Sequence, residues 1–136
     1  MKTITIRKDI SVFGIQVRTF PNGVGEAYDK LVKMIPGGFS RPYYGISYME
    51  NGKMIYYAAA EELNPGEAEK YSCERLSIKK GKYLAEELLN WRSKVHQVKD
   101  IFQRLVEDER TDKTTPGVEW YKNEEEMLCM IKTISQ

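Results

Sequence analysis

The sequence contains little cysteine and almost no histidine, which restricts the chemistry it can support. Its 136 residues include two cysteines, Cys73 and Cys129, and a single histidine, His96. The cysteines are far apart and each lies in a strand-like run, which is typical of small core residues rather than of a disulfide framework or a Cys-x-x-Cys metal site. A zinc or iron site would need carboxylates and distant thiols for nearly all of its ligands. We therefore expect no metal and no other cofactor.

Long apolar runs and an excess of one charge are also missing. No stretch approaches the roughly 18 apolar residues of a membrane span, and the opening MKTITIRKD has no apolar signal-peptide segment. Twenty-one Lys and Arg residues are interleaved with twenty Asp and Glu residues, for a net charge of +1. Duplex nucleic acid is a poor partner for such a distribution. We expect a cytoplasmic protein without a membrane partner and without direct DNA binding.

The first half of the chain predicts two strands and a helix. Apolar and polar residues alternate over residues 3–8 and 12–19, which is the pattern of half-buried strands. Asn22 is a candidate cap for a helix that the Pro-Gly-Gly run at 36–38 ends. Four apolar residues place one stripe on that helix at spacings of four, three and four: Val24, Tyr28, Leu31 and Ile35.

A β-hairpin follows the helix. Two β-rich runs, 43–50 and 53–61, flank Asn51-Gly52, a dipeptide that favours a two-residue hairpin loop because both residues tolerate positive φ. This loop determines the register of the two strands. The expected facing pairs are Tyr48 with Ile55, Ile46 with Tyr57, and Tyr44 with Ala59.

The second half of the chain repeats this order. Residues 72–78 and 82–88 are strand candidates, and apolar spacing predicts a helix from Trp91 to about Arg110. Residues 118–122 and 127–134 then predict a closing hairpin. We interpret the chain as one α+β domain over 1–136.

The repeated order indicates an internal duplication. Repeat one covers about 1–64 and repeat two about 67–136, with the Asn-Pro-Gly turn at 64–66 between them. An accidental likeness of the two halves is the alternative. A pseudo-two-fold pair of strand, helix and hairpin units predicts one curved antiparallel sheet with both helices on one face. The other face would then be free for a ligand.

Aromatic residues occur on both faces of the central hairpin, so each face must be covered. One face packs on the helices, and the other could be plain core, a dimer interface or a ligand cleft. Small residues beside the tyrosines leave volume that favours a cleft: Gly45, Ser47, Ala58 and Ala60. Tyrosine rings also bind cations over their faces.

Glu119 is a carboxylate within a strongly β-forming aromatic segment. Alternation places Glu119 and Tyr121 on one side of the strand and Val118 and Trp120 on the other. We take Val118 and Trp120 as the pair that joins the helix-side core, so Glu119 points to the ligand; an exposed strand edge is the alternative. Burial among rings would raise the pKa of Glu119 unless a cation lies beside it. Such a carboxylate can neutralise a bound cation or act as a general base.

Four segments of the chain form a recognisable series: YYGISY at 43–48, GKY at 81–83, PGVEWYK at 116–122 and LCMI at 128–131. Taken in this order, they resemble the GyrI-like family, the effector-binding domains of bacterial transcription activators. The resemblance covers essentially the whole chain, and its most specific part is the segment around Glu119. It implies a pseudo-symmetric fold with a cleft between the two halves that binds hydrophobic, often cationic, molecules.

The resemblance also implies the site residues. Glu119 corresponds to the acidic residue of the pocket, and it would be the catalytic residue if the protein is an enzyme. The implied aromatic neighbours are Tyr121, Trp120, Tyr44, Tyr48 and Tyr57. The face of the hairpin that lines the pocket stays open at this point.

Three functions are compatible with this resemblance. The first is the binding of a small hydrophobic or cationic molecule by a stand-alone, drug-sequestering or regulatory domain. The second is the hydrolysis of reactive cyclopropane-containing compounds through Glu119, which must hold a water near an electrophilic carbon. The third is a protein-binding role like that of a gyrase inhibitor. Many relatives carry a separate DNA-reading domain, for which we expect no room in this chain. A regulatory role would therefore require a protein partner.

Overall fold

The computed structural model describes residues 1–134 and confirms the α+β class. A single antiparallel sheet contains eight strands. The strands are β1 (Lys2–Ile6), β2 (Ile10–Gln16), β3 (Tyr43–Glu50), β4 (Lys53–Glu61), β5 (Glu74–Ile78), β6 (Gly81–Leu89), β7 (Gly117–Tyr121) and β8 (Glu126–Lys132). The helices are α1 (Val24–Met34), α2 (Glu67–Lys70) and α3 (Val98–Glu107), with 3₁₀ turns η1 (Gly38–Ser40), η2 (Trp91–Ser93) and η3 (Val95–Gln97). None of these helices is long and apolar enough to cross a membrane.

The strand order has the symmetry expected of a duplicated fold. It is β1-β6-β8-β7-β3-β4-β2-β5, so the two central strands, β7 and β3, join mirror-ordered halves. The first strand of each half pairs with the other half, because β1 pairs with β6 and β5 pairs with β2. The repeat boundaries at 1–64 and 67–136 stay a prediction.

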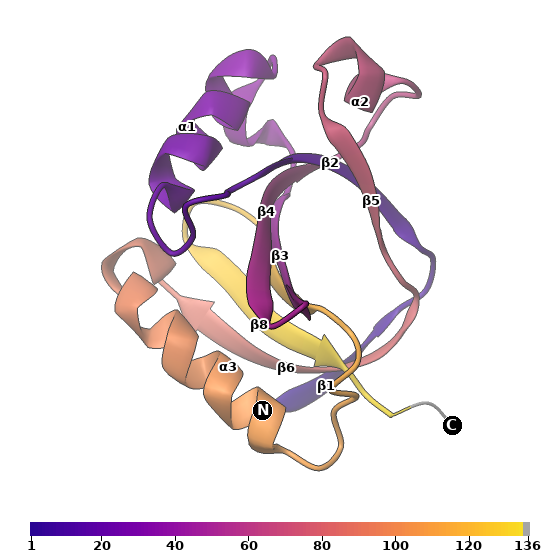
Figure 1. Ribbon diagram of the computed structural model, residues 1–136, viewed down its shortest axis with the longest axis vertical. Coiled ribbons are helices and arrows are strands. Elements are labelled where there is room, and N and C mark those ends of the chain that lie inside the picture. Colours follow the sequence, from indigo (N-terminus) through magenta and orange to yellow (C-terminus); the bar gives the residue numbers. More distant parts are fainter. Residues whose placement is uncertain (135–136) are drawn as a thin grey trace.

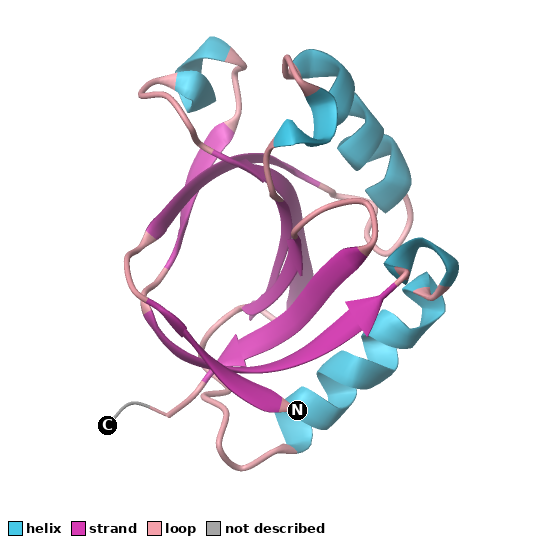
Figure 2. Ribbon diagram, turned by 180° about the vertical axis from the view of Figure 1, so that it is seen from behind, coloured by secondary structure: helices cyan, strands magenta, loops and turns pink. Residues whose placement is uncertain are grey.

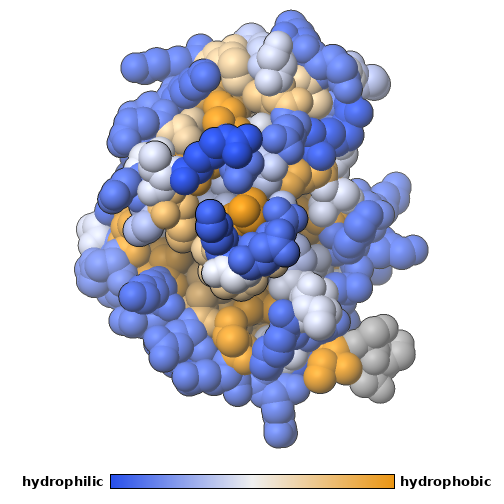
Figure 3. Space-filling model, viewed as in Figure 1, coloured by the Kyte–Doolittle hydropathy of each residue, from blue (hydrophilic) through white to orange (hydrophobic). Residues whose placement is uncertain are grey.

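The sheet curls strongly, so that its two faces differ (Figures 1 and 2). The helices lie outside the curl, and two clusters of buried residues pack beneath α1 and α3. The inner face has a core of its own, which includes Tyr44, Tyr57, Val118 and Met130. In the space-filling view, a few hydrophobic atoms are visible among hydrophilic side chains at the centre of the molecule (Figure 3). Much of the inner face is therefore buried in this core, whereas the sequence analysis expected that face to be free for a ligand.

The central hairpin has the predicted register. Asn51 and Gly52 both have positive φ, as a tight two-residue turn requires. Tyr48 faces Ile55, and Tyr44 faces Ala59. The same strand β3 pairs on its other edge with β7, where Gly45 faces Glu119. The hairpin thus joins the two halves of the molecule.

The helices begin differently from the prediction. Asn22 does not cap α1; Gly23, in a left-handed conformation, stands at the cap position without a side-chain hydrogen bond. The helix predicted to begin at Trp91 is α3, and it begins at Val98. Trp91 lies in η2, where its Nε1 donates to the carbonyl oxygen of Asn123 at 3.0 Å. This bond holds Trp91 against the β7–β8 turn. The spacing between Trp91 and the apolar residues that follow it therefore does not mark the start of a helix; Trp91 lines a cavity instead.

Candidate ligand pocket

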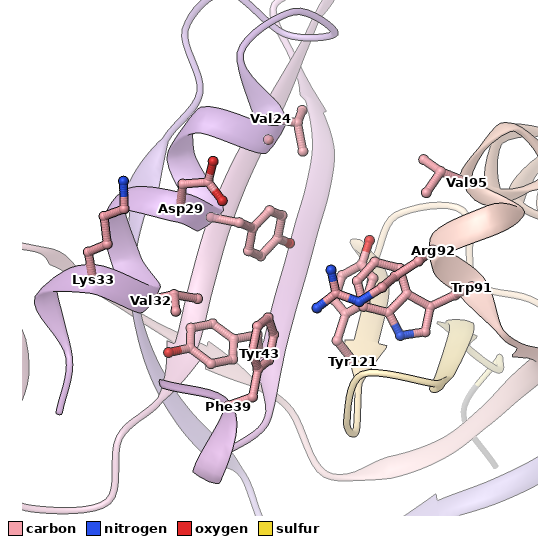
Figure 4. A pocket seen from close by; sticks show the side chains of 12 residues that line it. Val24, Asp29, Val32, Lys33, Phe39, Tyr43, Trp91, Arg92, Val95 and Tyr121 are labelled. Atoms are coloured by element: carbon pink, nitrogen blue, oxygen red, sulfur yellow. The ribbon is translucent and has the colours of Figure 1, made fainter. Parts of the chain in front are cut away.

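A cavity of about 390 Å³ lies on the outer face of the sheet, between α1 of the first half and the η2–η3 segment of the second. Its apolar and aromatic lining comes from both halves: Val24, Tyr28, Val32, Phe39, Tyr43, Trp91, Val95 and Tyr121. Three charged side chains also line it: Asp29, Lys33 and Arg92 (Figure 4). A cleft between the halves was predicted, and the structure places it beside the helices.

Glu119 is half-buried behind the wall of this cavity. Its Oε1 accepts hydrogen bonds from the Tyr121 hydroxyl at 2.6 Å and the Tyr56 hydroxyl at 2.8 Å. The carboxyl lies over Gly45, where a Cβ would come 2.6 Å from Oε1 and 2.3 Å from the Tyr56 hydroxyl. A side chain at position 45 would therefore force the Glu119 carboxyl and the Tyr56 hydroxyl to move.

Tyr28 extends the polar network from the sheet to α1. Its hydroxyl donates to the backbone carbonyl of Tyr44 at 2.9 Å and lies 2.9 Å from the Tyr56 hydroxyl. The ring of Tyr28 meets the ring of Tyr121 edge-on at 5.5 Å, and Tyr121 in turn meets Trp91 at 4.8 Å. These contacts couple the carboxyl to rings that line the cavity from both halves.

The electrostatics of the network follow from its burial. Burial raises the pKa of Glu119 above its usual value, and the hydrogen bonds from Tyr121 and Tyr56 oppose part of that rise. Burial, together with the negative charge of Glu119, raises the pKa of Tyr28, Tyr56 and Tyr121 well above the usual value for tyrosine. The tyrosines therefore remain protonated hydrogen-bond donors. Within residues 1–134, no cluster of three or more His, Cys, Asp or Glu residues is arranged to hold a metal ion.

Arg92 spans the cavity between the two halves. Its guanidinium carbon lies 5.0 Å from the centre of the Trp91 ring and 5.3 Å from that of Phe39, a residue of the η1 turn. The guanidinium also lies 3.4 Å from the Glu124 carboxylate, and the side chain is about half exposed. A protein cation thus occupies aromatic faces that a cationic ligand could use.

Of the six predicted site residues, Tyr121 lines this cavity and Glu119 lies behind its wall, bonded to Tyr121. Glu119 and Tyr121 share the outer side of β7, as alternation predicted. Trp120 and Val118 belong to the inner-face core, so the prediction that they join the helix-side core was wrong. The strong curl explains this difference, because it lets the inner face bury its own aromatic side chains.

The other three predicted tyrosines also face inward, away from the cavity. Tyr44 and Tyr57 are buried in the inner core, and Tyr48 packs against it. The hydroxyl of Tyr44 donates to Glu61 at 2.7 Å, and that of Tyr57 donates to Glu74 at 2.7 Å. Trp120 stacks on Tyr44 with ring centres 6.3 Å apart. These side chains form a separate aromatic cluster behind the sheet.

The predicted site lacks several residues of the cavity and of the hydrogen-bond network behind it: Tyr28, Phe39, Tyr43, Tyr56, Trp91 and Arg92. A signal existed for Tyr56, because the hairpin register places it on the same face as Gly45. Tyr28 and Trp91 had been assigned to helix stripes on the basis of their apolar spacing. Their role in the cavity depends on contacts between the halves, which spacing within one helix does not reveal.

Comparisons with known proteins place this geometry in a wider fold group. No family model and no curated protein matches the sequence. An integron cassette protein from the mobile metagenome of Vibrio cholerae shares the fold with a TM-score of 0.73 and 15% identity, over 98% of this chain and 95% of that one.

Two further solved structures share the fold. SAV2435, solved bound to tetraphenylphosphonium, has a TM-score of 0.71 and 15% identity over 98% of this chain and 93% of its own. A protein from Staphylococcus aureus MU50 that is assigned to bacterial transcription regulation has a TM-score of 0.60 and 14% identity, over 98% and 97%. At these identities the likeness establishes the fold, a curled antiparallel sheet with helices on its outer face.

Proposed function

We propose that this protein is a GyrI-like effector-binding protein whose cavity binds a small, hydrophobic, cationic molecule. The observation that carries this proposal is the Glu119 carboxyl, which lies without a protein cation behind a wall of aromatic rings. No ion pair among residues 1–134 includes Glu119. The tetraphenylphosphonium bound to SAV2435 is a ligand of this chemical class on the same fold.

The cavity suits such a ligand in size and in chemistry. Its volume of about 390 Å³ lies within the range of small-molecule sites, roughly 300 to 1,000 Å³. The rings of Tyr28, Trp91 and Tyr121 offer apolar area and negative faces to a lipophilic cation. Glu119 supplies the opposite charge in surroundings where water screens it poorly.

The test compares two ions of the same shape and opposite charge, tetraphenylphosphonium and tetraphenylborate, by isothermal titration calorimetry. We expect the native protein to prefer the cation. Glu119→Gln should weaken the cation at least about tenfold, or 1.4 kcal/mol, and should not weaken the borate. Equal weakening of both ions, or no binding of the cation by native protein, would contradict the proposal. Mass spectrometry of the recovered ligand would show any turnover, which would make the protein an enzyme.

A link to transcription regulation is the finer part of the proposal. The support comes from the neighbour assigned to transcription regulation and from the resemblance to effector-binding domains. The ligand-bound state would then be read by a protein partner. Pull-down from cells with and without tetraphenylphosphonium tests this: a partner that is retained in only one condition supports it, and identical sets of proteins contradict it.

A further inference from the structure

Four short oxygen–oxygen contacts form one continuous chain behind the cavity. The Tyr121 hydroxyl contacts Glu119 Oε1 at 2.6 Å, and the same oxygen contacts the Tyr56 hydroxyl at 2.8 Å. The Tyr56 hydroxyl contacts the Tyr28 hydroxyl at 2.9 Å, which contacts the Tyr44 carbonyl oxygen at 2.9 Å. Each contact has the length of a hydrogen bond and therefore requires one proton between its two oxygens.

The number of protons depends on the state of Glu119. A phenol contributes one proton and a carbonyl none, so an ionised carboxylate leaves three protons, those of Tyr28, Tyr56 and Tyr121, for four contacts. Two lone pairs would then face each other at one contact. A neutral Glu119 supplies the fourth proton, because a protonated carboxyl donates as well as accepts.

The protonated network has a single consistent direction. With Glu119 protonated, the 2.8 Å contact with Tyr56 reverses its direction, so that Glu119 donates to Tyr56 instead of accepting from it. Tyr56 then donates to Tyr28, Tyr28 donates to the carbonyl of Tyr44, and Tyr121 still donates to Glu119. Each of the four contacts then has one proton, so the three hydroxyls and Oε1 of Glu119 are all paired. An ionised carboxylate, in contrast, would lie half-buried without a counter-ion and would leave one contact without a proton.

The elements packed around Glu119 present no cation to it. Tyr56 of β4, Tyr28 of α1 and Tyr121 of its own strand face it with hydroxyls. On β8 the facing residue is Cys129, whose thiol is buried and has a raised pKa chiefly because of that burial. On β3 the facing residue is Gly45, which has no side chain.

The charged groups that line the cavity form no ion pair with Glu119. Asp29 and Lys33 line it from α1, and Arg92 lines it from η2. Arg92 is paired with Glu124. Burial also raises the pKa of Glu119, in agreement with the proton count. Among the described residues, no cation pairs with the Glu119 carboxyl.

We propose that Glu119 is protonated in the unliganded protein and that a cationic ligand binds in exchange for this proton. On binding, the O–H bond of the Glu119 carboxyl breaks, the proton passes to solvent, and the carboxylate neutralises the ligand. One positive charge enters as one leaves, so the net charge of the site does not change. This inference rests on the proposed function and defines the ligand class more closely: a cation that cannot supply a proton to the carboxyl itself.

The exchange predicts how affinity varies with pH. Below the pKa of Glu119, the affinity for a permanent cation should rise up to about tenfold for each unit of pH, and above it the affinity should level off. An anion or a neutral molecule of the same shape requires no such release, so its affinity should not rise with pH in this way.

The first experiment measures protons released on binding. Tetraphenylphosphonium is titrated at pH 6 in buffers of different ionisation enthalpy, with native protein, Glu119→Gln and Tyr57→Phe. We expect at least about half a proton per ligand for native protein and Tyr57→Phe, and none for Glu119→Gln. A glutamate of ordinary pKa, about 4.3, would release only about 0.02. Binding with less than about half a proton released overturns this inference and leaves the proposed function in place.

A second experiment needs no ligand. The infrared difference spectrum between native protein and Glu119→Gln reports whether the carboxyl is neutral or ionised as pH is varied. A neutral carboxyl band that persists to pH 6 supports the inference even if tetraphenylphosphonium does not bind, in which case only the proposed function fails. A carboxylate band already present at pH 6 overturns the inference, whatever the calorimetry shows.

Discussion

Gly45 and Glu119 face each other across β3 and β7, and the Glu119 carboxyl lies where a side chain at position 45 would be. A Cβ at position 45 would lie 2.6 Å from Oε1 of Glu119 and 2.9 Å from its Cδ. This pairing joins the two halves of the sheet at the floor of the site. The position of the Glu119 carboxyl, in the second half, therefore depends on the absence of a side chain at Gly45, in the first half.

Gly45→Ala should displace the carboxyl and disrupt the site. The added methyl overlaps the Tyr56 hydroxyl as well as Glu119, so we expect a loss of about 1 to 3 kcal/mol in unfolding free energy and weaker binding of tetraphenylphosphonium. The matched control is Gly25→Ala. Nothing lies within 4 Å of a Cβ at Gly25, which is helical, so this change should stabilise the fold by about 0.5 to 1 kcal/mol. Equal effects of both changes in chemical denaturation would contradict the steric argument.

Tyr121→Phe should weaken binding of the cation without unfolding the protein. The change removes one of two hydrogen bonds that stabilise an ionised Glu119 and keeps the ring that meets Trp91. We expect tetraphenylphosphonium to bind about three- to tenfold more weakly in calorimetry. Tyr57→Phe removes a hydroxyl from the inner face, where it donates to Glu74, and should leave the affinity unchanged. An effect of Tyr57→Phe as large as that of Tyr121→Phe would place the site on the other face.

Arg92→Gln should strengthen binding of the cation and weaken binding of its anionic counterpart. The guanidinium stacks between Trp91 and Phe39 and repels a second cation there. Removing it should raise the affinity for tetraphenylphosphonium about three- to fivefold and lower that for tetraphenylborate. Arg92→Lys is the control, since it keeps the charge but loses the planar stacking group. A fall in cation affinity with Arg92→Gln would show that Arg92 supports the bound ligand instead of competing with it.

Glu67 should make stability depend on pH in the acid range. It is buried and paired with Arg41 at 2.9 Å, and it accepts hydrogen bonds from the backbone of Leu63 and Asn64. The Arg41 guanidinium and these bonds lower the pKa of Glu67 to about 2. Because the folded value lies below the unfolded one, the stabilisation is present above about pH 4.5 and is lost as pH falls toward 2.

Denaturation of Glu67→Gln across pH checks this dependence. We expect a loss of about 3 kcal/mol at neutral pH, since Arg41 is left buried without its partner, and a smaller dependence on pH below 4.5. Glu69→Gln, on the same short helix, alters an exposed pair with Arg75 and should change little. An acid profile that is unchanged in Glu67→Gln would show that another carboxylate dominates this range.

The local pattern of the sequence was sufficient for most of the secondary structure. Alternation and turn chemistry predicted the hairpin at 43–61 with its register, because an Asn-Gly loop determines which residues face each other. The stripe at Val24 to Ile35 predicted α1. The pairing of Glu119 with Tyr121 on one side followed from the period of a strand alone. These are properties of neighbouring residues.

The tertiary structure decided which face of the sheet carries the site. The exchange of β1 and β5 between the halves and the strong curl bury Tyr44, Tyr57 and Val118 inside. They leave Glu119 on the outer face, in the network that Tyr28 of α1 joins. The contributions of Tyr28, Trp91 and Arg92 also arise only when segments far apart in the chain meet. A strand specifies that alternate residues face opposite ways, but it does not specify which way the sheet bends, because the bend depends on how all of its strands pair.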